Sequence, residues 1–140
     1  MNTIRAKAVC LVRNGTKILL AEGYDPGKKQ RYVIPVGGGI EFFESAKDAA
    51  VREVFEEIGV RVKNPRLLGV SENMFTFDSE PGHEIVFVFA AEFHDVSHYQ
   101  VAQFAGRESN DEPFVARWYE ESALKAGEIP FYPDGIVGMI

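Results

Sequence analysis

Residues 38–60 constrain the fold of this 140-residue chain more than any other stretch of it. They place charged residues and glycines at fixed intervals in what reads as a loop followed by a helix. The helix is expected over residues 45–58, with Ser45 as its N-cap and Gly59 just past its end. The residues at fixed intervals are Gly38, Glu44, Arg52, Glu53, Glu56, Glu57 and Gly59.

The predicted helix has two faces of opposite character. Glu53, Glu56 and Glu57 stand at i, i+3 and i+4, so their carboxylates share one face and repel one another. A hard divalent cation would compensate for this repulsion, and magnesium prefers carboxylate, water and phosphate oxygens. The opposite face is predicted to dock on a sheet. It consists of Val51, Val54, Phe55 and Ile58.

The spacing of these residues resembles the Nudix box, Gly-x5-Glu-x7-Arg-Glu-aliphatic-x-Glu-Glu-x-Gly-aliphatic. Residues 38–60 match it at every position, with Val54 and Val60 in the aliphatic places. The chain is therefore similar to the Nudix hydrolases. The resemblance implies an α/β fold, namely an α/β/α sandwich with a mixed β-sheet between helices. It also implies a pyrophosphohydrolase, in which a metal ion assists water attack at phosphorus.

The resemblance further implies a role for each residue of the box. Arg52 would orient a neighbouring carboxylate, and Glu44 would support the loop and make outer metal contacts. Phe43 stands where the family commonly has glycine. The metal ion would be Mg²⁺, with Mn²⁺ as a substitute. Its implied ligands are Gly38, Glu53, Glu56 and Glu57.

The general base that activates the attacking water is left open by the sequence. In some Nudix enzymes it is a box glutamate, and in others it lies on a later loop. Here the later-loop candidates are Glu108, Asp111 and Glu112, and a solvated loop charge is the alternative for each. The predicted catalytic residues are Glu44, Arg52, Glu53, Glu56, Glu57 and Glu112.

Residues before and after the box are candidates for substrate contacts. Gly37, Gly38 and Gly39 allow close approach of the backbone to a ligand, although a plain glycine-rich turn is the alternative. Arg31 is placed to contact a phosphate or a sugar. Four aromatic residues can stack a base, with core packing as the alternative for each. They are Phe75, Phe77, Trp118 and Tyr132.

Length, charge and hydropathy narrow the class of protein. Residues 1–140 are expected to form one domain. The net charge of −6 gives no attraction to long nucleic acids, so it favours a small nucleotide held through metal ions. No apolar run is long enough to span a membrane, no secretion signal is visible, and Cys10 reads as a buried thiol. A cytoplasmic protein is therefore expected, and a homodimer is left open.

The remaining elements follow from hydrophobic patterning and turn residues. A short helix is expected over residues 121–126, and a hairpin turn at Asn14-Gly15. Polar loops are expected over residues 22–31 and 94–112. Strands are expected over residues 4–12, 17–21, 32–34, 66–77, 84–93 and 114–119.

The box indicates the reaction but leaves the substrate open. The leading candidates are ADP-ribose and other sugar nucleotides, and nucleoside triphosphates, including oxidised ones. Two alternative functions are a Nudix-fold sensor that binds a nucleotide without turnover, and removal of pyrophosphate from RNA 5′ ends. The complete set of box carboxylates speaks against a sensor, and the acidic net charge speaks against RNA.

Overall fold

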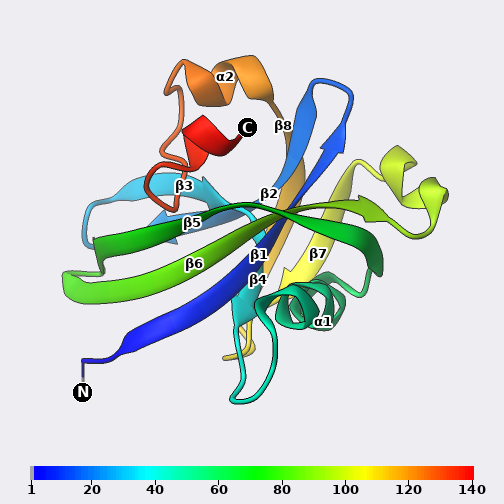
Figure 1. Ribbon diagram of the computed structural model, residues 1–140. Coiled ribbons are helices and arrows are strands. Elements are labelled where there is room, and N and C mark those ends of the chain that lie inside the picture. Colours follow the sequence, from blue (N-terminus) through cyan, green and yellow to red (C-terminus); the bar gives the residue numbers. More distant parts are fainter. Residues whose placement is uncertain (1) are drawn as a thin grey trace.

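The computed structural model describes residues 2–140 as an eight-stranded mixed sheet with helices on both faces (Figure 1). The strands are β1 (Ile4–Asn14), β2 (Lys17–Asp25), β3 (Gln30–Ile34), β4 (Val36–Gly39), β5 (Val62–Phe77), β6 (Glu80–Phe93), β7 (Gln103–Arg107) and β8 (Pro113–Glu120). Their order is β5-β6-β1-β2-β8-β7, with β3 beside β2 and β4 beside β1. Strands β1 and β6 run parallel and the other pairs run antiparallel.

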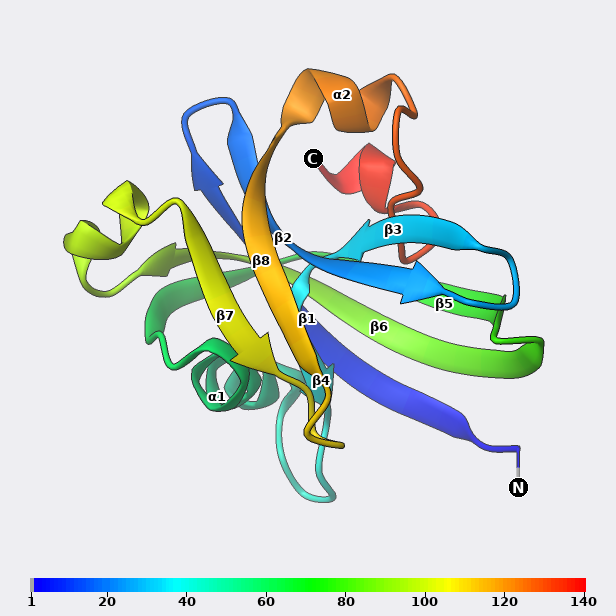
Figure 2. The ribbon, with the colours of Figure 1, turned by 180° about the vertical axis from the view of Figure 1, so that it is seen from behind.

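Helices cover the sheet from two sides (Figures 1 and 2). The longest is α1 (Ala46–Ile58), and α2 (Glu121–Lys125) and the 3-10 turn η2 (Ile136–Met139) lie on the opposite face. A second 3-10 turn, η1 (Val96–Gln100), precedes β7. The predicted sandwich with a mixed sheet between helices is confirmed. Within residues 2–140, no helix has the length and apolar character needed to cross a membrane.

Both ends of α1 lie where the sequence predicts them. The Oγ of Ser45 accepts a hydrogen bond from the N–H of Asp48 at 3.1 Å. Gly59 adopts a left-handed φ of 70°, and its N–H donates to the carbonyl of Phe55 at 2.9 Å. These bonds satisfy backbone groups that the helix itself leaves free. The caps therefore fix the turn of the helix at which each glutamate stands.

The face through which α1 docks differs in part from the predicted one. Val54 is buried as expected, but Phe55 is 43% exposed and the Arg61 guanidinium lies 4.5 Å from its ring centre. Ala49 and Ala50 are fully buried in its place. Their small side chains allow the helix to lie close to the sheet. Alanine carries little hydrophobic signal, so the sequence pattern pointed to the larger Phe55 instead.

Apolar side chains fill both faces of the sheet because neighbours along a strand alternate sides. Cys10 is buried, which confirms the predicted core thiol. Burial raises the pKa of this thiol to about 12. The core beneath α1 includes Ala8, Cys10, Val54, Phe89 and Phe93. The core beneath α2 and η2 includes Val9, Leu11, Val88, Leu124 and Ile136.

Three segments predicted as loops contain strands. Strand β2 continues to Asp25 and β3 begins at Gln30, so residues 26–29 are all that remains of the loop at 22–31. The loop predicted over residues 94–112 contains η1 and β7, and the glycine run belongs to β4. These strands are short and rich in glycine or polar residues, so their own sequences signal them weakly. Pairing with longer neighbours makes them strands.

The sheet divides into two halves toward one end. Strand β1 pairs with β2 only near the hairpin turn. At residues 7–10, farther from the turn, β1 pairs with β4 instead. Strand β2 meanwhile continues beside β3. The two halves diverge, with β2 and β3 on one side and β1, β6 and β5 on the other (Figures 1 and 2). Residues from both halves line the cavities described next.

Candidate active site

Arg52 is the centre of a hydrogen-bond network on α1. Its Nε and Nη2 donate to Glu44 at 2.7 and 2.9 Å, and its Nη1 donates to Glu53 and Glu56, both at 2.9 Å. The Nη2 also donates to the carbonyl of Gly39 at 3.0 Å. A planar guanidinium suits such a multiple contact. Arg52 therefore joins the loop before the helix, the helix and β4.

Glu44 is held firmly by this network. Hydrogen bonds from Arg52 and from the backbone of Glu41, at 3.0 Å, lower the pKa of its carboxyl to about 2. The carboxylate thus stays ionised and has its acceptor positions filled. Glu56, in contrast, has a side chain 55% exposed and is turned toward Arg52. Neither residue is among those that line the cavities below.

Glu53 lies directly against the glycine strand β4. It is buried, with 8% of its surface exposed. A Cβ atom at Gly38 would lie 2.4 Å from its Oε2, so only glycine leaves room for this carboxylate. Two of the predicted metal ligands, Gly38 and Glu53, are therefore side by side.

Glu57 has surroundings opposite to those of Glu44. Burial, followed by the nearby charges of Glu53 and Glu108, raises the pKa of its carboxyl to about 8. Lys7 and the backbone N–H of Gly37 offset this only in part. At neutral pH the group is mostly protonated unless a cation lies beside it.

A groove with a volume of about 920 Å³ passes these residues. The glycines of β4, the glutamates of α1 and the turn after β7 all contribute to its wall. The lining does not include Glu44, Arg52 or Glu56. These residues are connected to the groove only through the hydrogen bonds of Arg52. The predicted site residues that line the groove are Arg31, Gly37, Gly38, Gly39, Glu53, Glu57 and Glu112.

The groove fits a metal ion that a substrate helps to hold. Within residues 2–140, no three carboxylate, imidazole or thiol side chains gather into a ready-made metal cage. Magnesium does not need one, because it usually takes one or two carboxylates together with water and substrate phosphates. Glu57 supplies a carboxylate whose charge is only partly compensated by the chain. Glu53, whose Oε1 accepts from Arg52, presents its Oε2 next to a backbone that has no side chain in the way.

The later-loop carboxylates differ in their placement on the turn between β7 and β8. Glu108 lines both cavities, Glu112 lines only the groove, and Asp111 lines neither. Asp111 has a φ of 70°, and its carbonyl accepts a hydrogen bond from Arg107 at 2.9 Å. Asp111 therefore shapes the turn.

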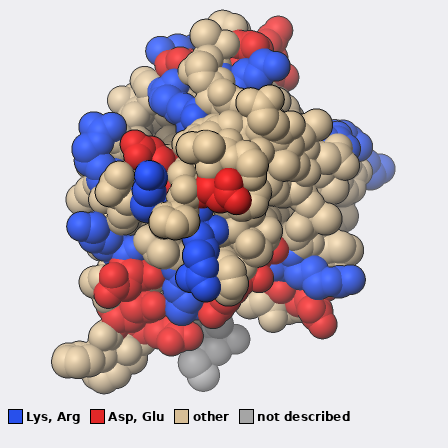
Figure 3. Space-filling view, turned by 90° about the vertical axis from the view of Figure 1, so that its right-hand side faces the viewer, with Lys and Arg blue, Asp and Glu red and all other residues tan. Residues whose placement is uncertain are grey.

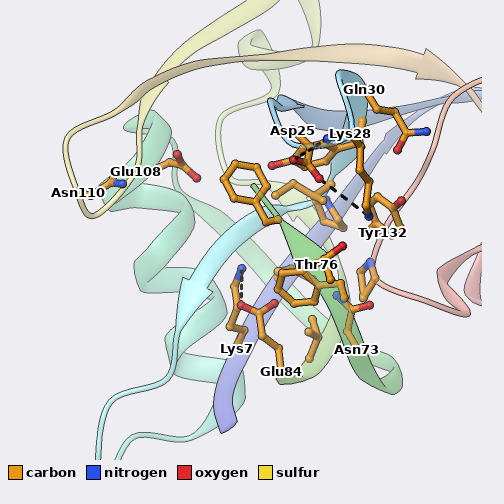
Figure 4. Close-up of a pocket in the computed structure, with 18 residues that line it drawn as sticks. Lys7, Asp25, Lys28, Gln30, Asn73, Thr76, Glu84, Glu108, Asn110 and Tyr132 are labelled. Atoms are coloured by element: carbon orange, nitrogen blue, oxygen red, sulfur yellow. Dashed lines mark hydrogen bonds and ion pairs between the residues drawn. The ribbon is translucent and has the colours of Figure 1, made fainter. Parts of the chain in front are cut away.

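A smaller cavity of about 320 Å³ adjoins the groove (Figure 4). The two share Tyr32, Phe77 and Glu108, so a ligand can extend from one into the other. Phe75 and Tyr132 complete an aromatic lining. Three of the four predicted stacking residues are thus brought to one place.

Trp118, the fourth stacking candidate, belongs to the core. Its ring centre lies 6.0 Å from that of Phe93. Its Nε1 donates to the carbonyl of Val101 at 2.8 Å, which satisfies the indole N–H. The packing alternative is the one that the structure supports for this residue.

Sequence reasoning missed three charged residues near these cavities. Lys7 and Glu84 line the smaller cavity, and Arg5 and Lys7 line the groove. The Nζ of Lys7 and the Nη1 of Arg5 each lie 3.8 Å from the Oε2 of Glu84. The alternation of Arg5 and Lys7 in the first predicted strand was the available signal. It places both side chains on one face of an otherwise apolar strand.

Asp25 was also missed, because the sequence placed it in a polar loop. It is 3% exposed, and its Oδ1 accepts hydrogen bonds from the N–H of Gly27 at 2.9 Å and of Asp78 at 2.8 Å. The first bond lies within the β2–β3 turn and the second reaches the β5–β6 turn. Asp25 therefore joins the two halves of the sheet beside the smaller cavity.

The sequence matches the family model of the NUDIX domain over residues 3–134. Diphosphoinositol polyphosphate phosphohydrolase 3-alpha of Mus musculus is 42% identical over 72 residues, which cover 49% of this chain and 42% of that protein. The uncharacterized Nudix hydrolase YvcI of Bacillus subtilis is 32% identical over 110 residues, which cover 73% and 65%. The chain spans less than half the length of the diphosphoinositol relatives.

Solved structures show the same arrangement of elements. A NUDIX hydrolase from Nitrosomonas europaea superposes with a TM-score of 0.66 at 18% identity, covering 98% of this chain and 86% of that one. MutT NUDIX hydrolase from Burkholderia pseudomallei has a TM-score of 0.61 at 20% identity, covering 86% of each chain. At these identities the likeness concerns the fold alone.

Proposed function

We propose that this chain, which belongs to the NUDIX domain family, is a pyrophosphohydrolase that cleaves a diphosphate bond of a nucleotide by water attack at phosphorus. One observation carries the proposal. Glu53 and Glu57 line a groove beside the glycine strand, and burial, followed by the like charges of Glu53 and Glu108, raises the pKa of Glu57 to about 8. Such a place favours a cation and the phosphates that it accompanies.

The residues of the chain would hold and orient the diphosphate. Glu53 and Glu57, with the carbonyl of Gly38, would bind Mg²⁺ or Mn²⁺, as in the family. When bound, such an ion neutralises phosphate charge and lowers the pKa of the attacking water. Arg52 is a positioning residue, because it touches Glu53 and lies outside the groove lining.

Glu108 is the general base that the geometry favours among the later-loop carboxylates. It lines both cavities, and its charge acts on Glu57, so it lies near the predicted metal ligands. In this role it accepts the proton of the attacking water. Glu112, which lines the groove only, is the second candidate.

A nucleotide fits the adjoining cavity better than a phosphorylated inositol does. Aromatic faces stack bases, and Tyr32, Phe75, Phe77 and Tyr132 line this cavity. The names of the diphosphoinositol relatives suggest the inositol class as a second candidate. That class has no aromatic ring and carries many negative charges, which a chain of net charge −6 attracts poorly.

The distribution of surface charge bears on the RNA alternative. On the face shown in Figure 3, acidic and basic side chains are intermixed and do not form a basic stripe. This does not favour the RNA 5′-end alternative. A cytoplasmic location and a homodimer stay predictions.

Product release from a substrate panel tests the proposed function. The panel contains ADP-ribose, other sugar nucleotides, dinucleoside polyphosphates, normal and oxidised nucleoside triphosphates, and a diphosphoinositol polyphosphate. Each is incubated with Mg²⁺, with Mn²⁺ or with EDTA. We expect cleavage of a nucleotide with metal and none with EDTA. Cleavage of the inositol compound alone would transfer the proposal to that class, and nucleotide binding without any cleavage would support the sensor alternative.

A further inference from the structure

Two polar side chains stand next to each other at one end of the smaller cavity. Asn73 of β5 and Glu84 of β6 are direct cross-strand partners, so their side chains leave the same face of the sheet. Figure 4 shows both at the lower end of the cavity. Asn73 is 6% exposed, and the side chain of Glu84 is 12% exposed. Little surface other than the cavity is open to them.

Asn73 is oriented by the C-terminal segment. Its Oδ1 accepts a hydrogen bond from the N–H of Asp134 at 3.2 Å. The nearby Ser71 donates to the carbonyl of the same Asp134 at 2.6 Å. With the oxygen engaged, the amide retains its N–H donors. Its nitrogen takes part in none of the side-chain hydrogen bonds found between residues 2–140.

Glu84 supplies acceptors that the described residues leave unused. The nearest cationic atoms, on Lys7 and Arg5, lie 3.8 Å from its Oε2. That distance balances charge but is too long for a hydrogen bond. No hydrogen bond between side chains of residues 2–140 ends on this carboxylate. An amide donor thus stands beside a carboxylate whose cationic neighbours lie beyond hydrogen-bond distance.

Aromatic rings border the Asn73–Glu84 pair. The ring of Phe75 lies over its cross-strand partner Gly82, where a Cβ atom would come within 2.4 Å of it. The ring of Tyr32 lies over Gly23 in the same way. The centres of the Tyr32 and Tyr132 rings lie 5.9 Å apart in an edge-to-face arrangement. The cavity is therefore suited to a planar heterocycle with N–H donors next to an acceptor.

We propose that Asn73 and Glu84 read the base of the nucleotide and select a guanine-type base. Guanine alone among the common bases offers two adjacent N–H donors, at N1 and N2, beside a carbonyl oxygen. The Glu84 carboxylate accepts from both donors, and the Asn73 amide donates to O6. Adenine would place an acceptor, N1, against the carboxylate. This inference rests on the proposed function, because it assumes that the diphosphate lies in the adjoining groove.

Calorimetric binding of GDP, IDP and ADP in EDTA tests the inference without turnover. IDP lacks only the 2-amino group, so we expect GDP to bind about tenfold or more tightly than IDP, with ADP the weakest. Glu84→Gln keeps the shape but replaces an acceptor with a donor, so the ratio of GDP to IDP affinity should fall toward one. Glu72→Gln is the matched control. It makes the same charge change on the opposite face of β5, where Glu72 pairs with Ile85, and should leave the ratio unchanged.

The outcomes separate this inference from the hydrolase proposal. Equal binding of GDP and IDP, or a preference that survives Glu84→Gln, overturns base reading. Substrate cleavage without base preference refutes base reading alone, whereas base preference without any cleavage refutes the hydrolase alone. If none of the three nucleotides binds in EDTA, guanosine, inosine and adenosine, which carry no phosphate that needs a metal ion, are compared instead, and the lack of a guanosine preference overturns base reading. If Glu84→Gln fails to fold, the wild-type comparison of GDP with IDP still decides.

Discussion

Glu44 and Glu57 belong to the same motif, but their surroundings act in opposite directions. Hydrogen bonds from Arg52 lower the pKa of Glu44 to about 2. Burial beside Glu53 and Glu108 raises the pKa of Glu57 to about 8. The chain itself satisfies the first carboxylate. It leaves the second without full compensation, so at neutral pH this carboxyl binds a proton unless a cation from outside takes its place.

Residues of one motif can therefore have different roles, some in the fold and others in the site. The Arg52 end of the motif holds the loop, the helix and β4 together, so it serves the fold. The Glu57 end keeps in a groove a carboxyl whose ionised form is unfavourable, which costs stability and is typical of a functional site. Substitutions at each end of the motif, and changes of pH, test this division.

The largest effect is expected from Glu57→Gln. Hydrolysis should fall by on the order of 100-fold or more, because the substitution removes a proposed ligand of the metal ion that activates the attacking water. The free energy of unfolding at neutral pH should stay level or rise, because folding no longer forces a carboxyl to bind a proton. Steady-state kinetics and urea unfolding measure both. The control Glu72→Gln should change neither, and a joint loss of stability and activity would contradict the division.

Substitution of Arg52 by methionine should act chiefly on the fold. Glu44 and Glu53 would lose their donors, so the free energy of unfolding should fall by about 2–3 kcal/mol. Arg13→Met is the control, because Arg13 forms an exposed pair with Glu121 at 2.9 Å that should contribute about 1 kcal/mol or less. Urea unfolding of both variants measures the difference. Equal losses would show that the network adds nothing beyond a surface ion pair.

The metal-free protein should lose stability as the pH rises from about 4.5 to about 8. The unfolded chain releases the Glu57 proton near its ordinary pKa of 4.5, whereas the folded chain keeps it to about 8. The folded state binds more protons in this window, so raising the pH favours unfolding. The contribution of Glu44 has the other sign and is lost only as the pH falls from 4.5 toward 2. Thermal unfolding in EDTA measures the slope, which Glu57→Gln should flatten.

The smallest effect is expected at the tip of the loop before α1. Phe43 is fully exposed and has a φ of 67°, a conformation that costs an L-residue about 1 kcal/mol and costs glycine little. Phe43→Gly should therefore stabilise the protein by about that amount. Phe42→Gly, equally exposed but without a positive φ, should not. A loss of stability in Phe43→Gly would mean that this ring, and not Arg52 alone, supports the loop.

Local signals were enough to predict α1 and its carboxylates. Ser45 and Gly59 act within one turn of the helix, and the spacing of Glu53 and Glu57 follows from helical geometry. Phe55 shows where such reasoning stops. Its exposure depends on how closely the small residues Ala49 and Ala50 bring the helix to the sheet, and no helical period reveals that distance.

The cavities could not be predicted from the sequence alone. Asn73 and Glu84 meet only because β5 and β6 pair in one register, which includes irregularities between Lys63 and Gly69. A slip of one residue would turn every side chain of β5 to the other face. Glu108 likewise reaches the groove only through the pairing of β7 and β8, in a segment whose polar sequence predicted a loop.

The size of the smaller cavity depends on Gly82, although Gly82 is not part of its lining. The ring of Phe75 occupies the space that a side chain at Gly82 would need. Even a methyl group there would press the ring toward the cavity and narrow it. Substrate preference can therefore drift during evolution, or be redesigned, by exchanges behind the wall, while every residue that faces the ligand stays the same.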